Sequence, residues 1–358
     1  MELFKEVNND FGTNYQYNTD ISWIEISSIV PFPMELFDKY KYHLFTSKII
    51  ELNDISEEFI EKYKDIIDWK SVSIYKELSE EFIEKYSEYI QWDKIGRFQY
   101  LSSKFIKKHI DKLNFYDITM YQYIPSEDLM EYLDKHKYDE LIFYRIVTIQ
   151  KLSEKFIKRY AHILNWNGVF TYQKMSEKLI DKFCDYLTWP EICQYQKLSE
   201  EFIEKHINDI IWYYISKYQK LSESFIRKHK TDLDLKCIID NWLYKSTDEK
   251  KQAVIDTGKY ECHDDYFIAY KAIRGDRYSL YNFQYKYEKG SVYESWCDCS
   301  DNENSFGLNV GTEKFAKDYG KTMTIRCKVI KCKVRYEDVG RIVYDGDKIR
   351  CFKIEILN

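Results

Sequence analysis

A segment of 23 residues recurs along most of this chain, and it limits the possible folds more than any other feature. Its clearest example reads LSEEFIEKHINDIIWYYISKY at residues 198–218. An apolar marker after the acidic pair returns every 23 residues, with one interruption of 24 and 27 residues. The markers are Leu36, Phe59, Phe82, Phe105, Leu129, Phe156, Leu179, Phe202 and Phe225. A fixed period of this length is typical of arrays whose repeats stack on their neighbours.

Each repeat begins with Leu-Ser, as at Leu198 and Ser199. Serine is a favoured N-cap because its hydroxyl accepts a hydrogen bond from an amide of the first helical turn. Glu200 and Glu201 follow, where the helix dipole favours negative charge. The apolar spacing then predicts an amphipathic helix of about ten residues.

The second half of each repeat carries a large residue at every third position, which predicts another short helix. The triplets are Trp69-Val72-Tyr75, Trp92-Ile95-Phe98, Phe115-Ile118-Tyr121, Trp166-Val169-Tyr172, Trp189-Ile192-Tyr195 and Trp212-Ile215-Tyr218. We interpret these rings as core packing between stacked hairpins rather than as a platform for nucleic-acid bases. The glutamines before Lys-(Leu/Met)-Ser are interpreted as polar spacers between hairpins, and a ladder of ligand-binding amides is the alternative. These are Gln150, Gln173, Gln196 and Gln219.

The repeat pattern predicts an α-helical solenoid of helical hairpins over residues 33–240, with residues 1–32 as a degenerate N-terminal cap. Residues 121–150 are irregular, and the helix expected after the one carrying Leu129 begins only near Leu152. Residues 241–261 read as a coupling helix, capped at Ser246 and ended at Gly258.

Beyond residue 262 the apolar period changes to about two, which is typical of strands. Strands are predicted at residues 266–273, 281–287, 324–334, 339–344 and 348–356, with Asp345-Gly346 as a hairpin turn. Thr312 is a plausible cap for one helix. Residues 262–358 are therefore predicted to form a small, mostly antiparallel α+β domain.

Charge and composition narrow the partners. Residues 262–358 carry 17 basic and 15 acidic side chains, a net charge of +2. The whole chain has a net charge of −6, so the remaining residues have a net charge of −8. An acidic array is a poor non-specific binder of nucleic acid. No apolar stretch is long enough for a membrane span, and the N-terminus lacks a secretion pattern. The odd count of nine cysteines, with Cys184 and Cys193 expected as buried thiols, favours a reducing cytoplasm.

The LSEEFIEKY…W…Y units resemble the short repeats of uncharacterised proteins from giant viruses of the mimivirus type and from large phages. The segments AYKAIRGDRYSLYNFQYKYEKGSVYE, FGLNV, YEDVG and DGDKIRCFK resemble a domain of unknown function at the ends of such repeat proteins. The resemblance implies a viral origin and expression in infected-cell cytoplasm. It implies no activity.

Two chemical hypotheses concern the C-terminal region. Cys297-Asp298-Cys299, with Cys262, His263, Cys327, Cys332 and Cys351, invites a zinc site. The C-x-C spacing and the lack of a second knuckle favour free thiols instead, so no metal is predicted. The region also loosely resembles an ADP-ribosyltransferase, with Arg274 ending a strand and Glu337 or Glu355 as the carboxylate. The histidines at one repeat position, His109, His206 and His229, replace tyrosine and read as packing residues.

The leading interpretation is a non-enzymatic scaffold whose repeats bind a host or viral protein, with no cofactor and no catalytic residue. The alternative is a nucleotide-binding or ADP-ribosyltransferase-like enzyme with its site in the C-terminal domain. The candidate ligand-binding residues for this alternative are Arg274, Tyr281, Thr312 and Glu337. The pattern does not predict an oligomeric state.

Overall fold

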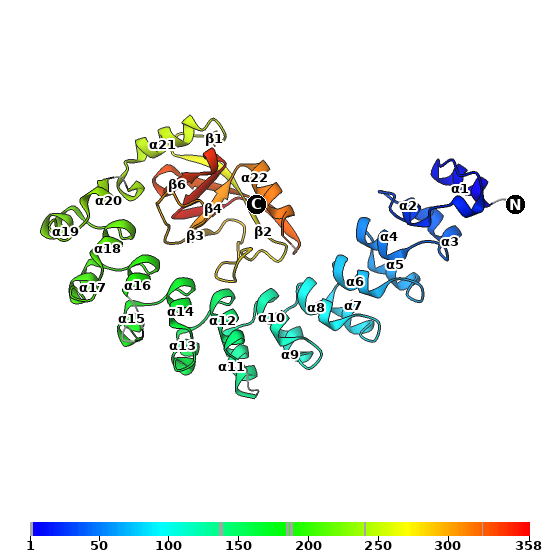
Figure 1. Cartoon of the computed structure of the whole chain (residues 1–358), viewed down its shortest axis with the longest axis horizontal. Coiled ribbons are helices and arrows are strands. Elements are labelled where there is room, and N and C mark those ends of the chain that lie inside the picture. The colour runs from blue at the N-terminus through cyan, green and yellow to red at the C-terminus, as the bar shows by residue number, and fades with distance from the viewer. Residues whose placement is uncertain (1–2, 136–138, 184–185, 187–188, 240, 324) are drawn as a thin grey trace. The chain divides into compact units, whose positions relative to one another are not determined.

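The computed structural model describes residues 3–135, 139–183, 186, 189–239, 241–323 and 325–358. By compactness the chain divides into two units, Met1–Gln122 and Tyr123–Asn358 (Figure 1). The division falls inside the stretch predicted to be irregular. Each unit is described by itself.

The first unit consists of short helices. Its N-terminal part holds α1 (Leu3–Phe11), η1 (Asn18–Asp20), α2 (Trp23–Ser27), η2 (Met34–Leu36) and α3 (Phe37–Tyr40). The first helices of the following repeats are α5 (Glu57–Lys62), α7 (Glu80–Lys85) and α9 (Ser103–Lys108). The second helices are α4 (Thr46–Leu52), α6 (Trp69–Tyr75), α8 (Trp92–Phe98) and α10 (Phe115–Tyr121). Successive second helices pack on one another.

The second unit continues the same alternation. Its first helices are α11 (Ser126–Lys135), α13 (Glu154–Tyr160), α15 (Glu177–Phe183), α17 (Glu200–Lys205) and α19 (Glu223–Lys228). Its second helices are α12 (Glu140–Ile149), α14 (Trp166–Tyr172), α16 (Trp189–Tyr195), α18 (Trp212–Tyr218) and α20 (Leu235–Ile239). The array ends in η4 (Trp242–Tyr244) and α21 (Thr247–Asp256), which Ser246 caps as predicted.

Two details of the helix prediction are wrong. Most first helices have six or seven residues rather than about ten, because the chain leaves the helix at residues such as Tyr63 and closes a separate turn. In that turn the amides of Ile66 and Ile67 both donate to the Tyr63 carbonyl. The irregular stretch also contains α12, which begins at Glu140 and not near residue 152.

The last part of the second unit is an antiparallel sheet, here called the β domain (residues 261–358). Its strands are β1 (Glu261–Cys262), β2 (Tyr266–Arg274), β3 (Val292–Glu294), β4 (Leu308–Gly311), β5 (Cys327–Arg335), β6 (Val339–Val343), β7 (Lys348–Cys351) and β8 (Lys353–Ile356). The described strands follow the order β3-β8-β5-β2-β4-β7-β6, and β1 pairs with β2. Helix α22 (Glu313–Lys321) packs on β2 and β5.

Several predictions for this domain are confirmed. Thr312 caps α22 by accepting a hydrogen bond from the Phe315 amide. Asp345 and Gly346 both have positive φ, 51° and 89°, in the turn between β6 and β7, which suits an Asp-Gly pair.

Other strand predictions are wrong or lie outside the described residues. Residues 281–287 form no strand, since their only ladder contact is an isolated bridge from Lys286 to Tyr278. The predicted strand at 348–356 is broken at Phe352, where β7 ends beside β4 and β6 and β8 continues beside β5. Thr324 and Cys184 are not among the described residues.

The chain is therefore a helical-repeat protein with a C-terminal antiparallel β domain. Within the second unit, Figure 1 shows α12, α14, α16 and α18 on the side of the sheet and α13, α15 and α17 on the far side.

Candidate functional site

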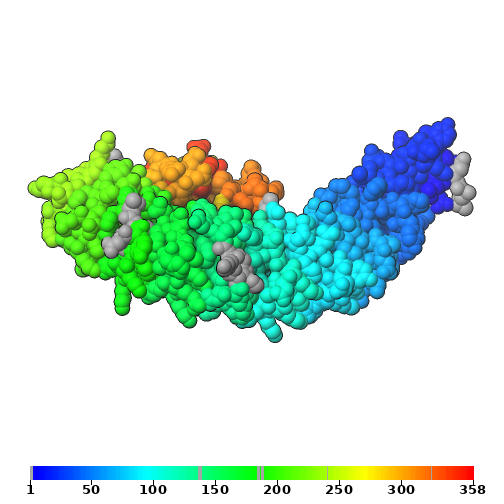
Figure 2. Space-filling view, turned by 60° about the horizontal axis from the view of Figure 1, so that its bottom comes forward, coloured from blue at the N-terminus to red at the C-terminus, as the bar shows by residue number. Residues whose placement is uncertain are grey.

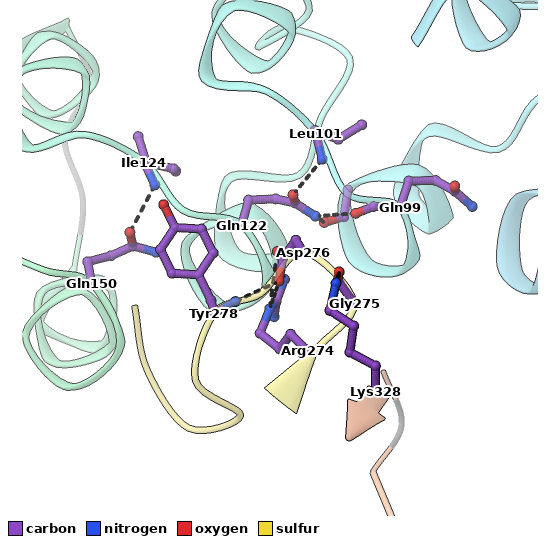
Figure 3. A network of polar contacts seen from close by, with 11 residues as sticks. Gln99, Leu101, Gln122, Ile124, Gln150, Arg274, Gly275, Asp276, Tyr278 and Lys328 are labelled. Carbon is purple, nitrogen blue, oxygen red and sulfur yellow. Dashed lines mark hydrogen bonds and ion pairs between the residues drawn. The ribbon is translucent and has the colours of Figure 1, made fainter. Parts of the chain in front are cut away.

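In most of the described repeats a buried glutamine joins the repeat to the one before it. Gln219 follows α18 and is 1% exposed. Its side-chain nitrogen donates to the carbonyls of Cys193 and Gln196, at 2.7 and 2.8 Å, and its oxygen accepts the Leu198 amide at 3.0 Å. The same three bonds recur at Gln99, Gln122, Gln173 and Gln196. Figure 3 shows Gln122 bonded to the Leu101 amide and Gln150 bonded to the Ile124 amide. We call this set of bonds the glutamine clasp.

The clasp shows that the interpretation of these glutamines as spacers is wrong. Each bonds backbone groups at the end of the preceding second helix and in the turn that follows it, where no helical partner is available. Near the ends of the array other residues take part in similar bonds. Asn53 accepts the Phe32 amide, and the Tyr244 hydroxyl accepts the Leu221 amide. A buried lysine, Lys76, donates to the Asn53 carbonyl in place of a glutamine.

A second set of contacts links the first helices. Glu177, in the first turn of α15, accepts bonds from both the amide and the hydroxyl of Ser199, the cap of the next first helix. The pairs Glu57–Ser79, Glu80–Ser102 and Glu200–Ser222 repeat this arrangement.

The histidines belong to a third set. His229 binds Glu204 at 2.8 Å, while Lys228 binds the same carboxylate at 2.6 Å. Lys228 and then His229 hold the pKa of Glu204 below its ordinary value. In another repeat the Tyr160 hydroxyl contacts Asp134 in the same way. The equivalence of histidine and tyrosine at this position supports a packing role.

The aromatic triplets divide into two groups. The tryptophans are buried or half-buried and lie against a ring of the next repeat, as Trp212 does against His229 at 4.9 Å. The third residues differ, since Tyr75 and Tyr172 are 43% and 42% exposed. The prediction that all rings of the aromatic triplets are buried in the core is therefore wrong for these two tyrosines. In an α-helix a residue six positions on lies about 120° around the axis from the first, so the third residue leaves the core side.

In the second unit these outward residues hold the β domain. We define the edge row as the last residue of each second helix and the residue two positions further on. The Ile149 carbonyl accepts the Phe283 amide at 2.8 Å, and Tyr195 lies 5.3 Å from Phe306. Lys174 donates to the Glu294 carbonyl at 3.1 Å. Further ring contacts join Tyr123 to Tyr278 and Tyr218 to Phe306. In Figure 2 the orange surface of the β domain lies against the green surface of these repeats.

The β domain contains a cavity of about 90 Å³ between α22, β4 and the segment after β2. Aromatic rings form one side, with Phe315 and Tyr319 stacked at 6.1 Å and Tyr281 6.3 Å from Tyr319. The lining also includes Asn309 and Lys348 from neighbouring strands. Neither residue was singled out from the sequence.

The structure does not bring the four predicted ligand-binding residues together. Tyr281 lines the cavity, and Thr312 lies at the start of α22 beside it. Arg274 is 4% exposed and forms an ion pair with Asp276, as Figure 3 shows. Glu337 is an exposed residue after β5 whose backbone carbonyl accepts Lys250. Arg274 and Glu337 are not among the cavity-lining residues.

The cysteines among the described residues form no disulfide bonds with one another. Cys193, Cys297 and Cys299 are buried and unpaired. Burial raises the pKa of the Cys297 thiol well above its ordinary value, which keeps it protonated and a poor metal ligand. Among the described residues no group of three or more histidine, cysteine or acidic side chains is placed to hold a metal ion.

No protein family, curated protein or solved structure matches the chain. No helix in the described part of the chain has the length and apolar character needed to cross a membrane.

Proposed function

We propose that the repeat array is an α-helical solenoid that acts as a non-enzymatic scaffold and binds a partner protein through its edge row. The observation that carries this proposal is the attachment of the β domain in the second unit. There the edge row binds a folded polypeptide through a backbone bond at Ile149 and ring contacts at Tyr195 and Tyr123. Rings and backbone groups are what a protein partner offers in general.

In the first unit the edge row has the same chemistry. Its helix-terminal members are Leu52, Tyr75, Phe98 and Tyr121, and Tyr75 is 43% exposed. An exposed ring adjoining a rigid helix provides large contact area at low entropic cost. The acidic charge of the array favours a partner with a basic surface, because complementary charge speeds association.

A photo-crosslinking amino acid at position 75 tests this proposal. A partner protein should crosslink at this position. In a separate affinity capture, a chain carrying Tyr75→Ala and Phe98→Ala should no longer retain that partner. The matched control places the crosslinker at Tyr42, which is 82% exposed but lies outside the edge row. Equal crosslinking at both positions, or capture unaffected by the double substitution, would contradict a role for the edge row.

A cytoplasmic location and a viral origin belong to the same proposal. The unpaired cysteines, among them buried Cys193, support a reducing compartment. The viral origin still depends on the sequence resemblance alone.

A further inference from the structure

We propose that the cavity of the β domain binds a small organic anion made of one planar ring and a carboxylate or phosphate group. The ring would lie among Phe315, Tyr319 and Tyr281, and the anionic group would contact the amine of Lys348. This inference is independent of the proposed scaffold function, because the edge row contributes nothing to the cavity lining.

The strand register places a cation at the cavity. Gly311 of β4 is paired with Tyr270 of β2 on one side and with Lys348 of β7 on the other. Residues paired in register share a face of the sheet, so Lys348 lies on the face that carries Tyr270. The Lys348 amine donates to the Glu303 carbonyl at 2.9 Å and lies 5.2 Å from the Tyr344 ring. Both Tyr270 and Tyr344 line the cavity.

The positive charge at this site has no carboxylate within ion-pair distance. Arg350 follows Lys348 on the same face of β7 and is fully buried, with its outer nitrogens bound to the carbonyls of Ser300 and Asn302. Lys271 follows Tyr270 in β2, so its side chain lies on the opposite face of the sheet. Its amine lies 5.3 Å from the core residue Tyr287 and donates to the Asn309 carbonyl at 2.7 Å. Among the described residues no acidic side chain forms a salt bridge with Lys348, Arg350 or Lys271. Buried charges of one sign are costly unless an opposite charge compensates them, and a bound anion would supply it.

Polar groups at the site are also incompletely paired. The side-chain oxygen of Asn309 and the Nε of Arg350 are buried and bond to nothing in the described part of the chain. Asn309 lines the cavity directly and is paired in register with Arg350. Buried polar atoms in native proteins usually have a partner, so an unpaired one beside a cavity points to a ligand. The Asn309 oxygen can only accept a hydrogen bond, so its partner would be a hydroxyl or N–H donor of the ligand and not the anionic group.

The enclosed part of the cavity is smaller than one aromatic ring needs. An apolar cavity of about 150 Å³ accepts benzene, whereas this one has about 90 Å³. It opens beside Tyr281, whose ring is 60% exposed, so part of the ligand would extend past this residue. The proximity of Phe315, Tyr319 and Tyr281 favours stacking on a planar group.

Calorimetric titration with benzoate, phenyl phosphate, inorganic phosphate and neutral benzamide tests the inference. We expect one aromatic anion to bind at least tenfold more tightly than benzamide and inorganic phosphate. Lys348→Met should weaken binding at least tenfold, and Lys348→Arg should restore part of it. The matched control is Lys314→Met, since Lys314 lies on α22 but its side chain is 88% exposed.

A second readout separates specific binding from a general charge effect. Burial, Arg350 and Lys271 lower the pKa of Lys348 to about 8, while Glu303 opposes them. A bound anion favours the charged amine, so binding near pH 8.5 should take up protons, and Lys348→Met should abolish this uptake. Changes in the NMR chemical shifts of the Asn309 and Tyr319 amides on titration of the wild-type protein would locate the bound anion without any substitution. No binding of either aromatic anion at 10 mM (about the weakest affinity worth assigning to a site), or shifts confined to other residues, would overturn the inference.

Discussion

In the repeat array, Gln219 satisfies two carbonyls and one amide of the preceding repeat. In the β domain, Arg350 is equally buried, but its Nε and the neighbouring Asn309 oxygen find no partner among the described residues. The array therefore completes these polar contacts with its own neighbours, whereas the β domain contains buried polar atoms without a partner among the described residues, beside the cavity where we propose a ligand. The comparison indicates that regular, self-satisfied regions serve structure, whereas an unpaired polar cluster in an otherwise packed domain marks a site.

The largest expected effect concerns the glutamine clasp. Gln219→Leu keeps the side-chain size but leaves two carbonyls and one amide unpaired, so it should destabilise the second unit by roughly 3 kcal/mol or more. Urea denaturation followed by circular dichroism measures this loss. An exposed residue outside the edge row provides the control, and Lys230→Ala should change stability by less than about 0.5 kcal/mol. Equal urea midpoints for the two variants would show that the glutamine clasp does not stabilise the array, and the contrast with the β domain would no longer hold.

A smaller effect concerns the charge of the β domain. The folded pKa of Lys348 is about 8 and lies below its ordinary value of 10.5. The unfolded chain therefore binds more protons between these values, and the lysine contributes more stability as pH rises. The wild-type stability minus that of Lys348→Met should grow by on the order of 1 kcal/mol from pH 7.5 to 9.5, allowing for partial exposure. Taking this difference cancels the opposing ionisation of buried thiols and phenols. A flat difference would show that Lys348 is not buried as described.

The glutamate that clamps the next helix cap should have a weaker effect. Glu177→Ala removes two bonds to Ser199 at a partly exposed position, which should cost about 1 kcal/mol. Glu201→Ala removes a first-turn carboxylate from α17 and serves as the control for loss of the helix-dipole interaction. Thermal melts that show the same change for both variants would mean that the clamp adds nothing beyond the dipole.

The smallest effect is expected at the histidine position. His229→Tyr introduces the residue that other repeats carry and keeps a hydrogen-bonding group near Glu204, so stability should change by less than about 0.5 kcal/mol. His229→Ala should cost more, because Trp212 loses the ring packed against it. If tyrosine proves as damaging as alanine in equilibrium unfolding, the repeats are not interchangeable at this position.

The array was predictable from sequence because its signals repeat. Ser199 and the residues equivalent to it cap helices as expected, and the 23-residue spacing gave the number and order of most hairpins. The role of the glutamines was missed, although a polar residue that recurs at a fixed place between buried positions is itself a signal. A local pattern does not show this role, because the bonding partners lie in the preceding repeat.

The cavity was harder to predict for a physical reason. A lysine in an alternating strand is ordinarily assigned to the solvent face, but α22 and the segment after β2 cover the face on which Lys348 lies. Such covering depends on tertiary packing that strand periodicity does not contain. Arg274, in contrast, looked available in the sequence but is neutralised by Asp276 two residues away.

Hydrogen exchange at the Leu198 amide tests the central claim most directly. This amide belongs to no helix and is protected only by its 3.0 Å bond to Gln219. We expect it to exchange as slowly as amides within α18 in the wild-type protein and at least a hundredfold faster in Gln219→Leu, a change of roughly 3 kcal/mol. Rapid exchange in the wild type, or equal protection in the variant, would contradict an array held together by glutamine clasps.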